Sequence, residues 1–154
     1  MSRYRISPED LSHPDVLELL RLHLAEMHKW SPPSKVHAMP PERLRAKDVT
    51  FFAAWEGEKL ACVGAIKELD PARGELKSMR ASPEYRGQGA GKAILKHLLS
   101  VAQGRGYRWI GLETGRPEPF LPAVRLYQQH GFAECPAFGD YVSDEFSLCM
   151  EKHL

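Results

Sequence analysis

The residues of this chain best suited to chemistry are three glycines within five positions. They lie in Tyr85-Arg86-Gly87-Gln88-Gly89-Ala90-Gly91-Lys92, between a β-rich run and a run of apolar residues at helical spacing. Glycines let the backbone turn so that successive N–H groups point into one hollow, and a helix start adds unpaired N–H groups and a positive dipole end. Such a turn can bind a phosphate. It can also be a tight connection whose glycines serve packing alone.

Two common phosphate-binding motifs do not match this turn. A P-loop requires Gly-Lys followed by Ser or Thr, whereas alanine follows Gly91-Lys92. The dinucleotide fingerprint requires a third glycine, and Lys92 occupies that position when counted from Gly87 and Gly89. The pattern that does fit is Arg-x-x-Gly-x-Gly, starting at Arg86, directly after a strand and opening a helix.

The elements that must position this turn follow from residue periodicity. β-rich and apolar runs predict strands at 3–7, 49–55, 60–66, 75–81, 108–114 and 145–152, with a further strand starting at Phe132. Helical spacing predicts helices starting near Pro14 and at 41–46, 90–104 and 119–130. The strands flanking the 90–104 helix should pair in parallel, and the three strands before the glycine turn in hairpin order. We therefore expect one domain, residues 1–154, of α/β class, with a mixed α+β sheet of about seven strands and four helices.

Composition narrows the functional class. The chain has 154 residues, 43% of them hydrophobic and 27% charged, as in ordinary globular proteins. A net charge of +1 argues against a nucleic-acid or membrane-surface binder. Because the sequence shows no long apolar run and no signal-peptide start, we expect a cytoplasmic protein. We also expect it to be a monomer or a homodimer. Cys62, Cys135 and Cys149 should be reduced and mostly buried, and no Cys or His spacing indicates a metal.

Over essentially its whole length the chain resembles the GNAT superfamily of N-acetyltransferases. The pattern from Arg86 to Gly91 is similar to the coenzyme A pyrophosphate loop of that superfamily. Leu126-Tyr127-Gln128-Gln129-His130-Gly131-Phe132 is similar to its Leu-Tyr-x-x-x-Gly-Phe signature, and the order of elements also agrees. Further stretches, among them 75–79 and 113–115, are similar to a bacterial subgroup of small GNAT enzymes. The resemblance implies the GNAT acyl-CoA N-acyltransferase fold.

The resemblance also implies a site for acetyl-CoA as co-substrate. Main-chain groups of Met79 and Ala81 would hold the acetyl and pantetheine portions, where the 75–81 strand splays from the 108–114 strand. N–H groups of residues 86–92 would hold the pyrophosphate. Many relatives place an asparagine after the fifth strand, where this chain has Thr114-Gly115-Arg116. The implied cofactor-binding residues are Met79, Arg80, Ala81, Arg86, Gly87, Gln88, Gly89, Ala90, Gly91 and Lys92.

Acetyl transfer to an amine needs a general base, because an alkyl ammonium with a pKa near ~10.4 is almost entirely protonated at neutral pH. Glu75 is the first candidate. It lies four residues before Met79, and period-two alternation would turn both side chains to one face of the strand. Alternatively, Glu75 is a solvated charge or an ion-pair partner of Lys77. Weaker candidates for the base are His37, Glu113 and Asp144.

The resemblance places Tyr127 near the thioester sulfur, where its phenol could protonate the leaving thiolate. Otherwise its ring fills space in the core. The N–H of Met79 would donate to the oxyanion. The loops around 30–37 and 138–141 carry aromatic and polar groups suited to a small acceptor. The residues that we expect to bind the acceptor are Trp30, Ser31, His37, Glu113 and Tyr141.

Three functions stay open at this point. The first is acetyl transfer from acetyl-CoA to a primary amine of a small molecule or amino acid, with a glutamate or water base and a tyrosine acid. The second is acetylation of a protein lysine or N-terminus, which would want an open groove. The third is a non-catalytic acyl-CoA-binding sensor. The presence of both Glu75 and Tyr127 favours an enzyme.

Overall fold

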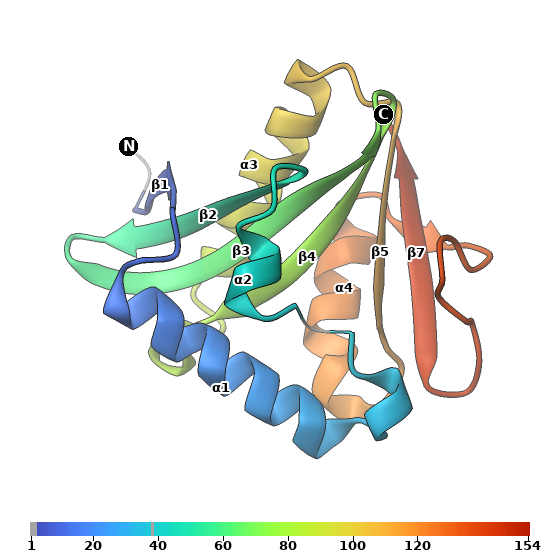
Figure 1. Cartoon of the computed structure of the whole chain (residues 1–154), viewed down its shortest axis with the longest axis horizontal. Helices are drawn as coiled ribbons and strands as arrows, with labels where there is room; N and C mark the ends of the chain where they lie inside the picture. The colour runs from blue at the N-terminus through green and yellow to red at the C-terminus, as the bar shows by residue number, and fades with distance from the viewer. Residues whose placement is uncertain (1–2, 38) are drawn as a thin grey trace.

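The computed structural model describes residues 3–37 and 39–154. In this part of the chain seven strands form one mixed sheet in the order β1-β2-β3-β4-β5-β7-β6. The strands are β1 (Arg5–Pro8), β2 (Val49–Glu56), β3 (Lys59–Asp70), β4 (Arg73–Ala81), β5 (Trp109–Gly115), β6 (Ala133–Glu134) and β7 (Ser147–His153). The four α-helices are α1 (Pro14–Trp30), α2 (Pro41–Leu44), α3 (Ala90–Gly104) and α4 (Leu121–Gln129) (Figure 1). The prediction of seven strands and four helices is confirmed.

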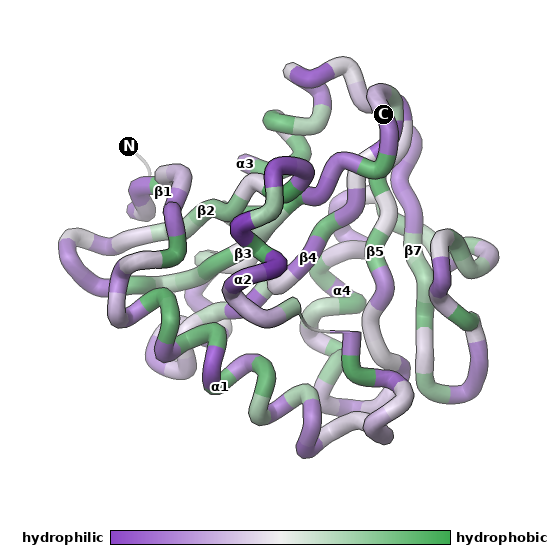
Figure 2. Tube along the Cα trace, in the orientation of Figure 1, coloured by the Kyte–Doolittle hydropathy of each residue, from purple (hydrophilic) through white to green (hydrophobic). Residues whose placement is uncertain are grey.

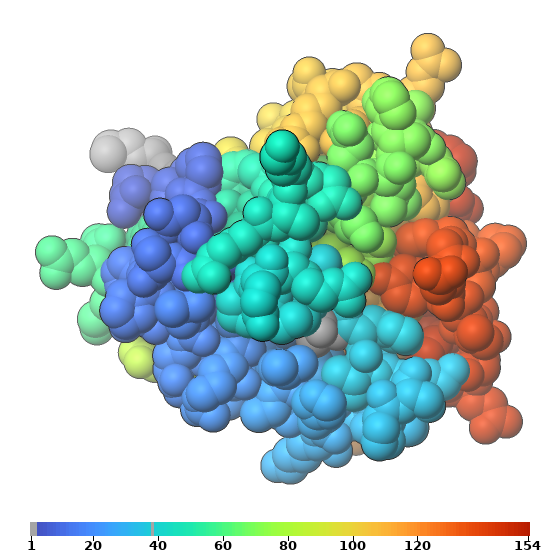
Figure 3. Space-filling model, in the orientation of Figure 1, coloured from blue at the N-terminus to red at the C-terminus, as the bar shows by residue number. Residues whose placement is uncertain are grey.

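Helices cover both faces of the sheet, because each face has its own apolar cluster. α1 and α2 lie on one face, and α3 and α4 on the other (Figure 1). Val16 and Leu20 of α1 pack with Phe51 and Val63 in one cluster. The residues of α3 pack in a second cluster, which also holds side chains from β4 and β5. Apolar residues recur along α1 and α3 (Figure 2). α1 and the segment after it cover much of the near face of the molecule (Figure 3).

The second cluster predicts a strong stability effect at Leu98, in the middle of α3. Leu98 is fully buried. We expect Leu98→Ala to lower the free energy of unfolding by about 3 kcal/mol, because the removed atoms leave a cavity that the sheet and helix cannot close. Urea denaturation measures this change. Val142→Ala is the control, since Val142 is 57% exposed, and a loss at Leu98 no larger than at Val142 would contradict the core assignment.

β4 and β5 are parallel neighbours over a short length only. Arg73–Glu75 pairs with Trp109–Gly111, and the two strands then separate (Figure 1). β4 continues along β3, and β5 pairs over its whole length with β7. The parallel pairing confirms the strand–helix–strand prediction. The separation opens at the carboxyl ends of the two strands, where open α/β sheets bind their ligands.

A β-bulge in β4 sets the direction of its side chains. Val63 pairs with Arg80 and Ala65 with Lys77, so Ser78 and Met79 together oppose a single residue of β3, and neither has a register partner there. Ser78 has a positive φ of 53°. An extra residue shifts the alternation by one position.

The bulge overturns one sequence-based argument. The side chain of Met79 packs against the cluster under α3, as does Leu76. Glu75, next to Leu76, points to the opposite face, where Arg80 forms an ion pair with Glu26 of α1. The prediction that Glu75 and Met79 share a face is therefore wrong, because alternation was assumed to run unbroken through Ser78.

The three cysteines, Cys62, Cys135 and Cys149, are buried and form no disulfide, as expected. Within residues 3–37 and 39–154, no helix has both the length and the hydropathy needed to cross a bilayer.

Candidate active site

The glycine-rich turn presents a set of backbone donors. Gly87 and Gly89 have φ values of 73° and 83°, a region that glycine adopts without strain. The first hydrogen bond of α3 runs from the N–H of Ala93 to the carbonyl oxygen of Gly89. The N–H groups of residues 90–92 therefore lie in the first turn, where no helical carbonyl can accept from them. With the helix dipole and the side chains of Arg86 and Lys92, they form a hollow suited to a diphosphate.

Gln88 is the one predicted cofactor residue that the structure keeps out of this hollow. Its N–H donates to the carbonyl oxygen of Tyr85 at 3.2 Å. Its side-chain amide donates to the carbonyl oxygen of Glu84 at 2.6 Å and accepts from Arg3 at 2.7 Å. Gln88 therefore closes the turn, and it does not line the cavity.

A cavity of about 900 Å³ runs from this hollow into the separation between β4 and β5. Its volume lies within the range of small-molecule sites. Glu75 and Tyr127 line it, as do all the other predicted cofactor residues. The predicted acceptor-binding residues also line it: Trp30, Ser31, His37, Glu113 and Tyr141.

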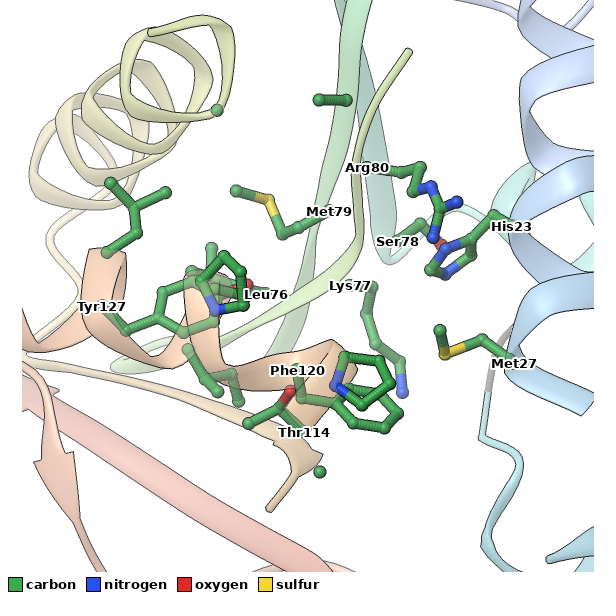
Figure 4. A pocket seen from close by; sticks show the side chains of 18 of the residues that line it. His23, Met27, Leu76, Lys77, Ser78, Met79, Arg80, Thr114, Phe120 and Tyr127 are labelled. Atoms are coloured by element: carbon green, nitrogen blue, oxygen red, sulfur yellow. The ribbon is translucent and has the colours of Figure 1, made fainter. Parts of the chain in front are cut away.

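The alternating side chains of β4 divide the cavity into two halves. Leu76 and Met79 face Tyr127 in what we call the α4 half (Figure 4). His23, Met27, Ser78 and Arg80 lie on the other side of the strand (Figure 4). We call this side, which also holds Glu75 and Lys77, the α1 half. The two halves meet where β4 and β5 separate.

Tyr127 lines the α4 half of the cavity. It is buried, and its ring lies 5.7 Å from that of Phe132. Burial raises the pKa of the Tyr127 phenol above its ordinary value, so the group keeps its proton at all physiological pH values. Tyr127 can therefore donate a hydrogen bond into the cavity.

A polar cluster lies in the α1 half. The hydroxyl of Tyr141 donates to the carboxylate of Glu75. The ammonium of Lys77 donates to the same hydroxyl at 2.5 Å and lies 3.2 Å from Oε2 of Glu75. Burial, and then the nearby carboxylate, raise the pKa of Tyr141. The alternative interpretation of Glu75 as an ion-pair partner of Lys77 is confirmed.

Glu113 faces this cluster from β5. Burial raises the pKa of its carboxyl to about 7, against the opposing effects of Ser147 and Lys77. A carboxyl with that pKa exchanges protons readily at neutral pH, as a general base must.

Two loops meet over the α1 half. Lys35 forms an ion pair with Asp144, and this contact lowers the pKa of Asp144 to about 2. The ring of His37 lies edge-on to that of Tyr141 at 5.1 Å. The 31–37 and 136–146 segments are thus linked across the cavity.

Several lining residues were not among the sequence-predicted site residues. His23 and Met27 precede Trp30 at spacings of seven and three, and all three line the cavity. This stripe of α1 could have been found from helical spacing once Trp30 was selected. Phe120 and Phe146 also line the cavity, but no motif marks them in the sequence.

The chain is similar to known acetyltransferases. The model of the acetyltransferase (GNAT) family matches residues 16–132. The chain is 44% identical to the uncharacterized N-acetyltransferase YsnE of Bacillus subtilis over 149 residues, which are 97% of this chain and 99% of that protein. It is 45% identical to the uncharacterized N-acetyltransferase YedL of Escherichia coli over 151 residues, which are 98% of this chain and 95% of that protein.

A solved structure shows the same fold. The GNAT family acetyltransferase from Elizabethkingia anophelis, crystallised with acetyl-CoA bound, matches with a TM-score of 0.72 over 100% of both chains, at 18% identity. The chain therefore belongs to the GNAT family of acetyltransferases. It is an acetyl-CoA-dependent N-acetyltransferase, and the resemblance seen in its sequence is confirmed.

Proposed function

We propose that residues 1–154 act as one domain that transfers the acetyl group of acetyl-CoA to the primary amine of a small molecule or amino acid, by direct attack. One observation carries this proposal. A single cavity joins the donor-rich hollow at the start of α3 to the α1 half, through the separation of β4 and β5. Two substrates can thus meet between the strands.

The donor would be held mainly by backbone groups. The N–H groups of residues 90–92, flanked by Arg86 and Lys92, would bind the pyrophosphate. Main-chain groups of Met79 and Ala81 would align the acyl arm, and acetyl-CoA bound there supplies an activated acetyl group. Met79 lies at the bulge without a register partner on β3. Its N–H is therefore the candidate donor to the acetyl oxygen as negative charge develops.

For the base we propose Glu113, with Glu75 as the residue that holds Lys77 and Tyr141 in place. Both carboxylates lie in the α1 half, but that of Glu75 is engaged by two donors. The pKa of about 7 at Glu113 matches the working pH of a base that takes a proton from an ammonium and releases it again. The prediction that Glu75 is the base stays a prediction, and the same experiment tests it.

That experiment is the pH dependence of kcat/KM. With Glu113 as base, activity should rise as the pH increases through about 7, since the deprotonated form is the active one. Glu113→Gln should remove this rise of activity with pH and lower kcat/KM about tenfold at pH 7.5. We expect a loss smaller than is usual for a general base, because Glu75 remains. If the rise survives in Glu113→Gln and disappears in Glu75→Gln, the base is Glu75.

The contacts that link the two segments over the acceptor end favour a small acceptor over a protein. A peptide strand that entered there would have to pass the Lys35–Asp144 and His37–Tyr141 contacts. A screen of acetyl-CoA thiol release against amines, amino acids, aminoglycosides and short peptides tests the proposal. We expect release with a small amine. Release with peptides alone would indicate a protein acetyltransferase, and tight acetyl-CoA binding without any release would indicate a sensor.

A further inference from the structure

Three polar atoms at the wall of the α1 half are buried and lack hydrogen-bond partners. Among residues 3–37 and 39–154, four buried side-chain atoms lack a partner: Nδ1 of His23, Oγ of Ser78, Nε of Arg80 and Oγ of Ser147. The first three belong to residues that line the cavity, and Ser147 does not. The side chains of these first three residues point toward one another across the space between α1 and β4 (Figure 4). Buried polar atoms are nearly always paired in folded proteins, so three unpaired atoms at one place in a ligand cavity indicate a missing partner.

The guanidinium of Arg80 is held in a fixed orientation. Its Nη2 donates to Glu26 of α1, and its plane lies over the ring of Trp30, with Cζ 5.5 Å from the ring centroid. Oε1 of Glu26 is also 3.5 Å from Nη2 of Arg86. Arg80 therefore cannot turn to pair its Nε elsewhere without losing these contacts. The site is preorganised for a group that brings its own acceptor atoms.

The chemistry of the three atoms indicates which ligand group would bind there. Nε of Arg80 can only donate, and the hydroxyl of Ser78 and the neutral imidazole of His23 can each donate as well. Burial, and then the charge of Arg80, lower the pKa of His23 to about 4, so the ring is neutral near pH 7. Three convergent donors, one of them on a guanidinium, match the oxygens of a carboxylate.

We propose that His23, Ser78 and Arg80 form a subsite for the carboxylate of the acceptor, and that the acceptor is an α-amino acid with an apolar side chain. This inference rests on the proposed function. Ser78 directly precedes Met79, the candidate donor to the acetyl oxygen, and neighbouring Cα atoms are only ~3.8 Å apart. A carboxylate at Ser78 therefore demands an amine close to it, as in an α-amino acid.

The walls beside the subsite are apolar. Met27, Trp30, Phe120 and Phe146 line the same cavity. The ring of Phe120 lies edge-on to Trp30 at 6.1 Å and to Phe146 at 5.7 Å. An aromatic or large aliphatic side chain would contact these rings, whereas a charged one would lose its hydration there.

The test compares L-phenylalanine with L-phenylalaninamide, which keeps the amine and the ring but lacks the carboxylate charge. We expect wild-type kcat/KM to be at least about tenfold higher for the acid, the size of one charge-assisted hydrogen-bonded contact. Equal use of the two acceptors would overturn the subsite. The subsite would also be overturned if the protein acetylated other amines but neither L-phenylalanine nor L-phenylalaninamide, although the proposed function would then stand. Failure to bind acetyl-CoA at all would overturn the proposed function itself.

Substitutions in the subsite test whether its residues cause the preference for L-phenylalanine over L-phenylalaninamide. Ser78→Gly removes the hydroxyl and suits the positive φ, and Arg80→Lys keeps a charge for Glu26 but removes Nε. Each should reduce the preference for the acid over the amide to near unity, mainly through KM of the acid, and Ser78→Gly should keep its activity on the amide. The amide is thus an internal control for folding. Arg21→Lys, on the exposed side of α1, should keep the full preference. A preference that survives both subsite variants would overturn the proposal.

Discussion

Replacing Gly89 by valine is expected to raise the Kd for acetyl-CoA by about 100-fold or more, which corresponds to about 2.7 kcal/mol of lost binding free energy. The φ of Gly89 is 83°, a conformation that a β-branched residue does not adopt without strain. A side chain added there meets no protein atom within 4 Å. It would therefore stand in the open hollow that we assign to the pyrophosphate. Isothermal titration calorimetry with acetyl-CoA measures the change.

Gly57 provides a matched control for this variant. It has a φ of 60° and also has no protein atom within 4 Å of an added side chain, but it lies in the turn between β2 and β3. Gly57→Val introduces comparable backbone strain far from the start of α3. We expect its affinity for acetyl-CoA to equal that of the wild type. Equal weakening in both variants would mean that strain, and not occupation of the hollow, explains the loss.

The second large effect is expected at Tyr127. Tyr127→Phe should lower kcat by about 100-fold, the lower end of the range for a general acid, with the Kd for acetyl-CoA unchanged. Burial raises the pKa of Tyr127, so complete transfer of its proton to a free thiolate is unfavourable. Its contribution must come as the bond to sulfur breaks, through a hydrogen bond that strengthens with the developing charge. Steady-state kinetics and calorimetry separate the two quantities.

Tyr107 serves as the control for this substitution. It is also a buried tyrosine of the cluster under α3, but its hydroxyl donates to Glu68 at 2.7 Å, outside the cavity lining. Tyr107→Phe should change stability and leave kcat unaltered. Unchanged turnover in Tyr127→Phe would remove the acid role and leave Tyr127 as a packing residue.

The elements that depend on local patterns could be predicted from the sequence. Glycine spacing and the apolar stripe from Ala90 to Ala102 define the loop and α3. The order strand–helix–strand then requires the parallel pairing of β4 with β5. The family motifs identified Tyr127 and the hollow at the start of α3 as candidate parts of the site. All of these rest on residue types whose local preferences agree with the fold.

Features that depend on long-range register could not be predicted. Within β4 no glycine marks the bulge at Ser78, and only the pairing of β4 with β3 reveals that Glu75 and Met79 face opposite ways. Gln88 belongs to the motif, yet a hydrogen bond to Tyr85 uses its N–H.

The subsite at His23 could not be predicted either. It depends on α1 packing across β4, so that residues 55 positions apart in the chain, His23 and Ser78, line one cavity.

The central claim is that backbone amides at the start of α3 hold a diphosphate and so place a thioester between β4 and β5. Calorimetric titration with acetyl-CoA and with S-acetylpantetheine, which carries the same thioester without the diphosphate and nucleotide, tests it most directly. We predict binding of acetyl-CoA and at least about 100-fold weaker binding of S-acetylpantetheine. Equal affinities, or no heat of binding with acetyl-CoA, would contradict the claim.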